Sequence, residues 1–268
     1  MPLVVCPTPI GNLEDVTLRV LRELREADLV LCEDTRRTRV LLDRHGLSPP
    51  LQSFHRHNEA ARAAEIVPRL AAGERIALAS DAGLPAVNDP GAGLVRKALE
   101  RGLEVTVLPG PSAVETALVA SGLVGERYAF LGYLPRGRAA LLRTWEETSA
   151  WPWPVVAFES PRRLPTALAA LADHDPMRPV AVCRELTKRF EEVVRGSALE
   201  LGGRFAEPPR GEITLVVGAP ATQSRHPSPE AVAAVGELVA SGISRRRAAE
   251  LVGKLTGAPR NALYQATL

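Results

Sequence analysis

Residues 3–32 read LVVCPTPIGNLEDVTLRVLRELREADLVLC, and this stretch decides the fold class. Its two apolar runs, Leu3–Cys6 and Leu29–Cys32, have the length and composition of buried strands. Between them, the leucines of residues 18–24 recur every three residues, which indicates a helix. The same alternation of short apolar runs and helical periodicity continues along the chain. It predicts an α/β protein with a mainly parallel sheet.

Six further apolar runs extend this pattern as predicted strands. They are Arg75–Ala79, Glu104–Leu108, Ala129–Leu131, Pro154–Phe158, Val180–Cys183 and Ile213–Val217. Helical spacing recurs between them at Ala63, Ile66, Val67 and Leu70, and more loosely at Leu164, Leu168 and Leu171. In the second half, Glu191–Arg195 and Glu212–Val217 flank a turn-rich stretch, which predicts antiparallel pairing there.

Proline- and glycine-rich segments predict three parts of the chain, residues 1–111, 112–219 and 220–268. The first boundary falls in Leu108-Pro109-Gly110-Pro111-Ser112, where proline and glycine end a strand. The second opens a polar, proline-rich stretch, PATQSRHPSP, which predicts a linker. A helical module follows, with Ser228-Pro229-Glu230 as a strong helix start. Its expected helices end at Gly242, at Gly257 and at Thr267.

The composition and charge of the chain exclude several classes of protein. The 268 residues are 46% hydrophobic and 24% charged, which excludes wholesale disorder. A formal net charge of +2 excludes an all-over polycation, and no apolar run approaches the length of a membrane helix. The start lacks the basic segment of a signal peptide, so we expect a cytoplasmic protein. Cys6, Cys32 and Cys183 lie far apart in apolar runs and are predicted to be buried thiols.

Three loops at predicted strand ends have the character of ligand-binding segments. Pro7–Leu13 follows the first strand, where open α/β sheets bind ligands, although an ordinary turn explains it equally well. Neither a phosphate-binding Gly-Lys-Ser/Thr nor a dinucleotide G-x-G-x-x-G is present. Ser80–Pro85 combines small residues with Asp81, which suits a nucleoside ligand. The third loop is Pro109–Ala113, in which Ser112 is equally explained as a helix cap, as is Asp89 before Pro90.

Two arginine clusters stand where a helix disfavours cations. Asp34 or Thr35 is expected to cap a helix whose first turn carries Arg36, Arg37 and Arg39. In the tail, Arg245, Arg246 and Arg247 follow Ser244 in the same way. The tail from residue 222 holds six basic and three acidic side chains, a net charge of +3, which leaves −1 for the rest. Solvated arginine explains either cluster alone; together they favour a nucleic-acid partner.

The segment His55-Arg56-His57-Asn58-Glu59 carries two alternate histidines. A metal pair would need a third ligand, and the sequence offers none, so we expect no metal. A substrate-facing loop and an exposed polar loop are the interpretations that stay open. There is no G-x-S-x-G elbow and no Ser/His/Asp set.

Taken together, nine segments resemble one family, the ribosomal RNA small subunit methyltransferase I family of the tetrapyrrole-methylase superfamily. They are PTPIGNLEDVTLR, LCEDTRRTR, FHRHNE, SDAGLPAVNDPG, LPGPSA, FLGYLPR, ESPRRL, CRELTKRFEEVVRG and RGEITLVV, in consistent order from Leu3 to about Gly218. The tail ending in Ala262-Leu263-Tyr264 also fits the family. One departure is Arg162, which stands where the family is expected to have histidine.

The resemblance implies two α/β domains with S-adenosylmethionine bound between them, in a homodimer. It implies 2′-O-methylation of a cytidine in the decoding centre of 16S ribosomal RNA. The cofactor contacts it implies fall on Pro9, Asp81, Ala82, Gly83, Leu84, Ser112, Ala113, Glu159, Ser160, Glu185, Leu186, Ile213 and Thr214. The RNA contacts that we expect are Arg36, Arg37, Arg39, His57, Arg245, Arg246 and Arg247.

Methyl transfer from a sulfonium needs no metal, because the donor is already activated. The protein must align the acceptor oxygen with the methyl group and remove a proton from a weakly acidic hydroxyl. The expected candidates for this base are Glu159, Glu185, Asp34 and His55. A tetrapyrrole C-methyltransferase shares the fold and cofactor but does not need a basic tail. A non-catalytic RNA-binding or ribosome-assembly factor is the third possibility, and cofactor binding argues against it.

Overall fold

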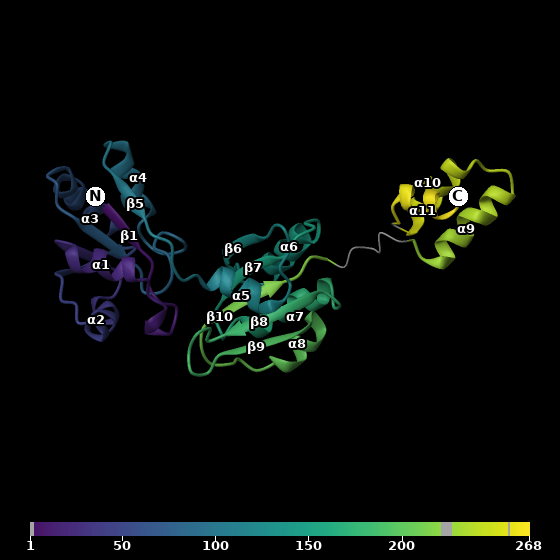
Figure 1. Ribbon diagram of the computed structural model, residues 1–268. Coiled ribbons are helices and arrows are strands. Elements are labelled where there is room, and N and C mark those ends of the chain that lie inside the picture. The colour runs from purple at the N-terminus through teal and green to yellow at the C-terminus, as the bar shows by residue number, and fades with distance from the viewer. Residues whose placement is uncertain (1–2, 221–226, 257) are drawn as a thin grey trace.

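The computed structural model describes residues 3–220, 227–256 and 258–268. The strands in these ranges form two five-stranded sheets, drawn as separate groups in Figure 1. The first sheet is parallel throughout, in the order β3-β2-β4-β1-β5. Its strands are β1 (Leu3–Cys6), β2 (Leu29–Cys32), β3 (Leu51–Ser53), β4 (Ile76–Ala79) and β5 (Val105–Val107). The α/β class predicted from the sequence is confirmed.

Helices cover both faces of this sheet, which is why its central strands are apolar without alternation. They are α1 (Leu18–Glu26), α2 (Thr35–Arg44), α3 (Glu59–Ala71) and α4 (Ala92–Glu100), with a short 3-10 turn at Leu13–Asp15. Leu3 of β1 packs in a cluster with residues of α3 and α4. The next residue, Val4, packs in the opposite cluster with residues of α1 and α2. All four residues of β1 are therefore buried.

The second sheet is mixed, in the order β6-β7-β10-β8-β9. Its strands are β6 (Ala129–Tyr133), β7 (Val155–Glu159), β8 (Pro179–Arg184), β9 (Glu192–Ser197) and β10 (Ile213–Val217). Among these described strands only the β6–β7 pair is parallel, so antiparallel pairing does occur in this half, as predicted. The two runs from which it was predicted, now β9 and β10, do not pair with each other, because β8 lies between them. The helices are α5 (Ala113–Ser121), α6 (Arg138–Ser149), α7 (Leu164–His174) and α8 (Ala198–Arg204).

Residues 229–266 contain three helices that pack on one another. They are α9 (Pro229–Ala240), α10 (Arg245–Thr256) and α11 (Arg260–Ala266), and they share a core that includes Val235, Ala248 and Leu263. Ser228 caps α9 as predicted, accepting from the Ala231 N–H at 3.2 Å. The linker prediction falls largely on residues 221–226, and the stop at Gly257 also lies outside the described residues. The domain boundaries at 111/112 and 219/220 stay predictions.

Three other features bear on the sequence predictions. Cys6, Cys32 and Cys183 are free and buried, as expected. Among the helices of the described ranges, none has the length and hydropathy to cross a membrane. The helix predicted from the spacing of Leu18, Leu21 and Leu24 is confirmed as α1. Its first residue, Leu18, is nevertheless 86% exposed, whereas Leu24 is fully buried. Leu18 opens the helix, and the buried face runs through Val20 and Leu24 instead.

The two leucines of α1 give a matched test of this packing. Leu24→Ala should destabilise the protein by about 2–5 kcal/mol, because it leaves a cavity against the sheet. Leu18→Ala, on the same helix, should change the free energy of unfolding by less than about 0.5 kcal/mol. Chemical denaturation of both variants measures the difference. Equal effects would contradict the face assigned to α1.

Candidate active site

One cleft of about 860 Å³ is lined by residues from both sheets and from the loops that follow their strands. Its lining comes from the loops that follow β1, β2, β4 and β5, from the start of α5, and from the ends of β6, β7 and β10. The contributions of the first sheet all lie at the carboxyl ends of its parallel strands. This is the edge at which open α/β sheets bind ligands. The volume lies in the range of small-molecule sites.

The loops after β1 and β4 are joined by backbone hydrogen bonds. Thr8 and Gly83 each donate an N–H to the other's carbonyl at 2.9 Å. The Ser80 hydroxyl donates to the Gly83 carbonyl at 2.6 Å, and the Thr8 hydroxyl donates to the Ser80 carbonyl at 3.0 Å. Gly83 has φ +78°, a left-handed conformation that favours glycine. These contacts fix the floor of the cleft.

Most of the expected cofactor residues line this cleft. They are Asp81, Ala82, Gly83, Leu84, Ser112, Ala113, Glu159, Ser160, Leu186, Ile213 and Thr214. Two expected residues are not among its lining, Pro9 and Glu185. Pro9 is buried, and its neighbour Ile10 reaches the cleft instead. The Glu185 carboxylate accepts from the Lys188 ammonium at 3.0 Å and the Glu212 N–H at 2.8 Å, contacts within its own loop region.

Asp81 is positioned by the segment that follows β2. Its carboxylate accepts from the Asp34 N–H at 3.0 Å and from the Arg37 guanidinium at 3.1 Å. Arg37, expected to contact RNA, therefore lies in the cleft wall beside Asp81. Asp34 caps α2 as predicted, accepting from the Arg36 N–H at 2.9 Å. The Arg36 guanidinium also holds the pKa of Asp34 down to about 2.

Ser112 occupies the N-cap position of α5, but its side chain makes no capping hydrogen bond. Its hydroxyl donates to the Glu115 carboxylate instead. The Tyr128 hydroxyl donates to the other Glu115 oxygen at 2.6 Å. The predicted capping role of Ser112 is therefore wrong for the side chain, because Glu115 competes for its hydroxyl. Both Ser112 and Glu115 line the cleft.

The four expected base candidates are all engaged in other contacts. Glu159 lines the cleft, but its carboxylate is buried, paired with Arg163 and bonded to the Ser160 N–H at 2.6 Å. Burial raises the pKa of Glu159, and the Ser160 N–H and Arg163 oppose that rise. The Glu212 N–H and Lys188 lower the pKa of Glu185. The contacts of Glu185 therefore favour its ionised form, and those of Glu159 hold its carboxylate in place against the opposing effect of burial.

The remaining candidates, Asp34 and His55, are not among the residues that line the cleft. Asp34 pairs with Arg36 at 2.7 Å. The His55 ring lies 3.3 Å from the Asn58 amide nitrogen, and the backbone N–H of His55 donates to the Asn58 side-chain oxygen at 2.8 Å. His55 thus helps to shape the turn before α3. His57, expected at the RNA, is exposed near it, with the ring centroids 6.0 Å apart.

The charge of the cleft is strongly negative. The described lining residues include six carboxylic acids, Glu33, Asp81, Asp89, Glu115, Glu159 and Glu212, against the single guanidinium of Arg37. Sequence reasoning missed Glu33, Glu115 and Glu212 as site residues, and it interpreted Asp89 as a cap. The missed signal is the position of Glu33 and Asp89 directly beside the chosen motifs. An acidic cleft of this kind favours a cationic ligand.

The expected RNA contacts in the tail differ from one another. Arg247 pairs with Glu250 at 3.0 Å, and Glu250 also accepts from Lys254. Arg245 is half-buried. Arg246 is exposed and forms no ion pair with a described residue. Arg39, beside the other arginines of α2, likewise forms no ion pair within the described ranges.

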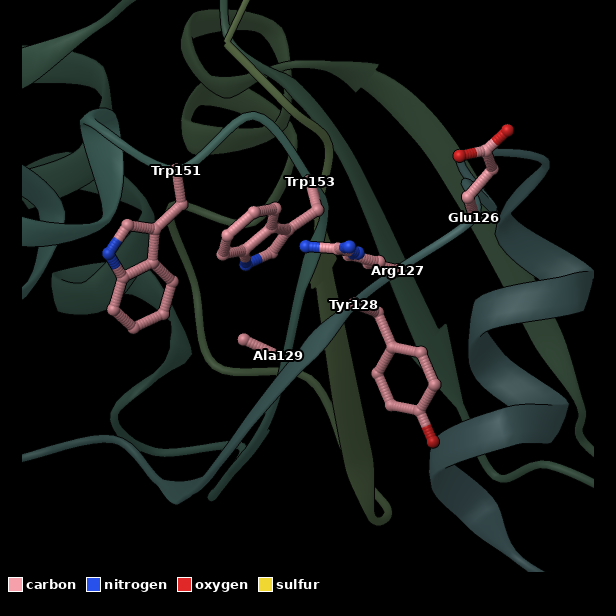
Figure 2. A pocket seen from close by; sticks show the side chains of 6 residues that line it. All are labelled: Glu126, Arg127, Tyr128, Ala129, Trp151 and Trp153. Atoms are coloured by element: carbon pink, nitrogen blue, oxygen red, sulfur yellow. The ribbon is translucent and has the colours of Figure 1, made fainter.

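A second hollow of about 530 Å³ lies at the opposite, amino-terminal ends of β6 and β7. Figure 2 shows the Arg127 guanidinium beside the indole of Trp153, with Trp151 next to it. Tyr128 extends from this hollow and also lines the cleft. Among the described residues of its lining, Glu126 is the one carboxylic acid. With none of the predicted site residues, this hollow is not the candidate site.

Comparison with known proteins shows which family the chain resembles. The family model described as Tetrapyrrole (Corrin/Porphyrin) Methylases matches residues 2–202, and the one described as RsmI C-terminal HTH domain matches residues 226–268. Ribosomal RNA small subunit methyltransferase I of Thermotoga maritima is 44% identical over 80% of this chain and 97% of its own. Its namesake from Mesorhizobium japonicum is 40% identical over 99% of this chain and 91% of its own.

The chain belongs to the ribosomal RNA small subunit methyltransferase I family. This membership confirms the expected enzyme class, a methyltransferase that uses S-adenosylmethionine. A uroporphyrin-III C-methyltransferase from Thermus thermophilus, solved with S-adenosylhomocysteine, has the same fold, with a TM-score of 0.57. It is 19% identical over 81% of this chain and 96% of that chain, so it supports the fold alone.

The cleft fits this methyl donor by its chemistry. S-adenosylmethionine carries a sulfonium and an ammonium against one carboxylate, so its net charge is positive and suits the acidic lining. The small side chains after Asp81 leave room for a nucleoside. Within the described residues, no cluster of histidine, cysteine, aspartate or glutamate has the arrangement of a metal site.

The floor of the cleft offers a matched pair of glycines for a test. Gly83→Val should cost about 1–2 kcal/mol of stability, because its φ is left-handed, and should weaken S-adenosylhomocysteine binding at least about tenfold. Gly46→Val meets the same φ restriction, at +64°, in a turn with no other atom within 4 Å of the new Cβ. Calorimetry should find normal binding in the Gly46 variant. Normal binding in the Gly83 variant would remove this loop from the site.

Proposed function

We propose that this enzyme methylates the ribose 2′-hydroxyl of a cytidine in the decoding centre of small-subunit ribosomal RNA. The observation that carries the proposal is the extent of the similarity. A relative named ribosomal RNA small subunit methyltransferase I matches 99% of the chain, tail included. The tetrapyrrole enzyme with the same fold covers 81%. An RNA substrate gives the basic helical tail a purpose that a tetrapyrrole does not.

The chemistry asks little of the protein beyond alignment and proton removal. S-adenosylmethionine supplies an electrophilic methyl group, and the side chains of the cleft must hold the acceptor oxygen in line with it. Asp81 is held in place by Arg37 and the Asp34 N–H, so it presents a fixed negative charge to the donor. Ser112 and Glu115 hold the wall at the start of α5. These fixed groups bind and orient the donor without rearrangement.

The alternative is a tetrapyrrole C-methyltransferase. It is disfavoured because the solved uroporphyrin-III and cobalt precorrin-4 methyltransferases share no more than 22% identity with this chain. The curated relatives at 38–44% identity all carry the ribosomal RNA name. A non-catalytic assembly factor, the third class, is disfavoured by membership in a methyltransferase family. Binding of S-adenosylhomocysteine, measured by calorimetry, would argue further against it.

The proposal is tested by supplying the protein with labelled S-adenosylmethionine and undermodified small ribosomal subunits, and separately with naked ribosomal RNA. We expect one labelled ribose in the decoding region, located by nuclease digestion and mass spectrometry. Label on a base, at many sites, or only on a tetrapyrrole would contradict the proposal. Comparing subunits with naked RNA identifies the form of the substrate. An RNA substrate also implies action in the cytoplasm.

We further propose that the enzyme works as a homodimer, as the family resemblance implies. Sedimentation at micromolar concentration, with and without the donor, measures its mass. A monomer under both conditions would contradict this part of the proposal.

The tail offers a defined place for the RNA backbone. Arg246, Arg260, Asn261 and Tyr264 line a hollow of about 200 Å³ on the surface of α10 and α11. Neither arginine pairs with a carboxylate of a described residue, and Arg260 donates only to the Asn261 side-chain oxygen at 3.3 Å. Two unpaired guanidiniums in one hollow favour a phosphate. The neighbouring Arg247 is already paired with Glu250.

This difference gives a sharp prediction. The double variant Arg246→Gln with Arg260→Gln should weaken RNA binding and flatten its dependence on salt, because fewer counterions are released. The slope of log affinity against log salt should fall by about one for each phosphate that the variant no longer neutralises. Filter binding over a range of salt concentrations measures it.

Arg247→Gln is the matched control. It removes a cation from the same helix turn, but one that Glu250 already neutralises, so its effect on the salt slope should be smaller. Binding of S-adenosylhomocysteine should stay normal in the double variant. An unchanged salt slope in the double variant would contradict the assigned hollow.

A further inference from the structure

One carboxylate of the cleft, that of Asp89, has no evident structural role. Asp89 lines the cleft but makes no hydrogen bond or ion pair with any described residue. The sequence before Pro90 predicts a helix cap, yet the N-cap position of α4 is Gly91. A single oxygen of the Glu59 side chain accepts from the N–H groups of Gly91 and Gly93, each at 3.1 Å. Since Glu59 performs the capping, Asp89 is free for another purpose.

We propose that Asp89 is the proton acceptor of the methyl transfer, a role that rests on the proposed function and names its base. In this step the substrate's 2′-oxygen forms a bond to the methyl carbon while the bond from that carbon to sulfur breaks. The electron pair of the broken bond stays on sulfur, which becomes a neutral thioether. The hydroxyl proton passes to the Asp89 carboxylate, and release to solvent restores the carboxylate.

Elimination among the cleft carboxylates supports this choice. Four of the six are held by other groups: Asp81 by Arg37, Glu115 by Tyr128, Glu159 by Arg163 and Glu212 by Lys188. A carboxylate whose oxygens already accept hydrogen bonds or ion pairs from other groups has less capacity left to accept a proton from a substrate. Among the described lining residues, that leaves Asp89 and Glu33 without such partners.

The surroundings of Asp89 favour it as the base. Burial raises the pKa of Asp89 to about 6, and the negative charges of Glu33 and Asp81 add to the rise, against a small opposing effect of Arg56. Tyr133, at the end of β6 in the other sheet, has a pKa raised by burial, and the negative charge of Asp89 adds to that rise. A base with a pKa close to the working pH accepts a proton well and is mostly in its active form.

The loop that carries Asp89 is held in a strained conformation at the junction of the two sheets. Ala86 and Asn88 have left-handed φ values of +70° and +64°. Asn88 lies so close to β6 that a Cβ on Gly132 would come within 2.8 Å of its side-chain oxygen. The Arg56 guanidinium donates to the Asn88 carbonyl at 3.4 Å. Strain of this kind persists where a side chain must be held in place, here Asp89 between both walls of the cleft.

The test is Asp89→Asn, assayed as single-turnover methyl transfer to the ribosomal substrate. We expect the rate to fall by about 100-fold or more, with S-adenosylhomocysteine affinity within about threefold of the parent. In the parent, the rate should rise with pH through about 6 as Asp89 ionises. The variant should lose this rise. A rate within about threefold of the parent, or an unchanged pH profile, would overturn the proposal.

Glu33→Gln is the matched control, an unpaired carboxylate in the same cleft. It should keep the rise of rate with pH but move it to lower pH, because the negative charge that raises the pKa of Asp89 is gone. Loss of the rise in the Glu33 variant, with its retention in the Asp89 variant, would assign the base to Glu33 instead. A parent that labels no RNA contradicts the proposed function itself, whereas a fully active Asp89 variant contradicts only the base.

Stability supplies a readout that does not depend on activity. A carboxyl group whose pKa is raised by folding contributes its full stabilisation of the native state at pH values below its unfolded pKa. That contribution is lost as the pH rises through about 6. Asp89→Asn should therefore melt at a higher temperature than the parent at about pH 7.5, and the difference should shrink toward about pH 4. A variant less stable than the parent at the higher pH would indicate a structural role and overturn the proposal.

Discussion

The backbone bridge between Thr8 and Gly83 is the constraint on which the cleft depends. β1 and β4 are adjacent parallel strands, with Cys6 opposite Ala79, so their loops leave the sheet side by side. The two hydrogen bonds of the bridge hold these loops together just beyond the sheet. Ile10, past the bridge, then packs with Leu186 and Val114 in the core of the second half. One short segment thus sets the floor of the site and joins it to both sheets.

Some carboxylates around this floor are paired with a cation, and others are not. Arg37, Arg163 and Lys188 each hold one cleft carboxylate, which lowers the cost of crowding so many acids together. The lining still holds six carboxylic acids against the single guanidinium of Arg37, so the cleft suits a cationic donor. Asp89 lacks a cation at pairing distance, and burial, together with the charges of Glu33 and Asp81, raises its pKa to about 6. The same cluster therefore provides both the binding field and a titratable group.

The sequence was enough for most of the first sheet, because strands buried on both faces are continuous apolar runs. It did not reveal β3, whose three residues LQS include only one apolar side chain. The helix α8 was missed although Ser197 and Glu200 form a capping box, because two glycines interrupt its pattern. Loops at strand ends were sound guides to the cleft, as Asp81 and Ser112 illustrate. Pro9 and Glu185 were carried over as contacts, but their neighbours Ile10 and Leu186 line the cleft.

The errors about individual side chains have a common cause, contacts between residues distant in sequence. The use of Asp89 depends on Glu59, from a helix much earlier in the chain, which takes over the capping of α4. The position of Arg37 depends on Asp81, which lies in another loop. Local patterns assign such residues to the nearest helix end, since capping is the common local role. The pairing of Arg247 with Glu250 is the exception, because a spacing of three residues on one helix is visible in the sequence.

The separation of charge between cleft and tail resolves a conflict in the proposed reaction. The donor is a cation and needs acidic walls, whereas the acceptor belongs to a polyanion that such walls repel. The chain before residue 222 has a net charge of −1, and the tail has +3. In the proposed reaction, attraction for the RNA backbone would therefore come from the tail, whose helices pack on one another, rather than from the cleft. Only the ribose that is to be methylated has to enter the negative region, and a neutral hydroxyl loses little there compared with a phosphate.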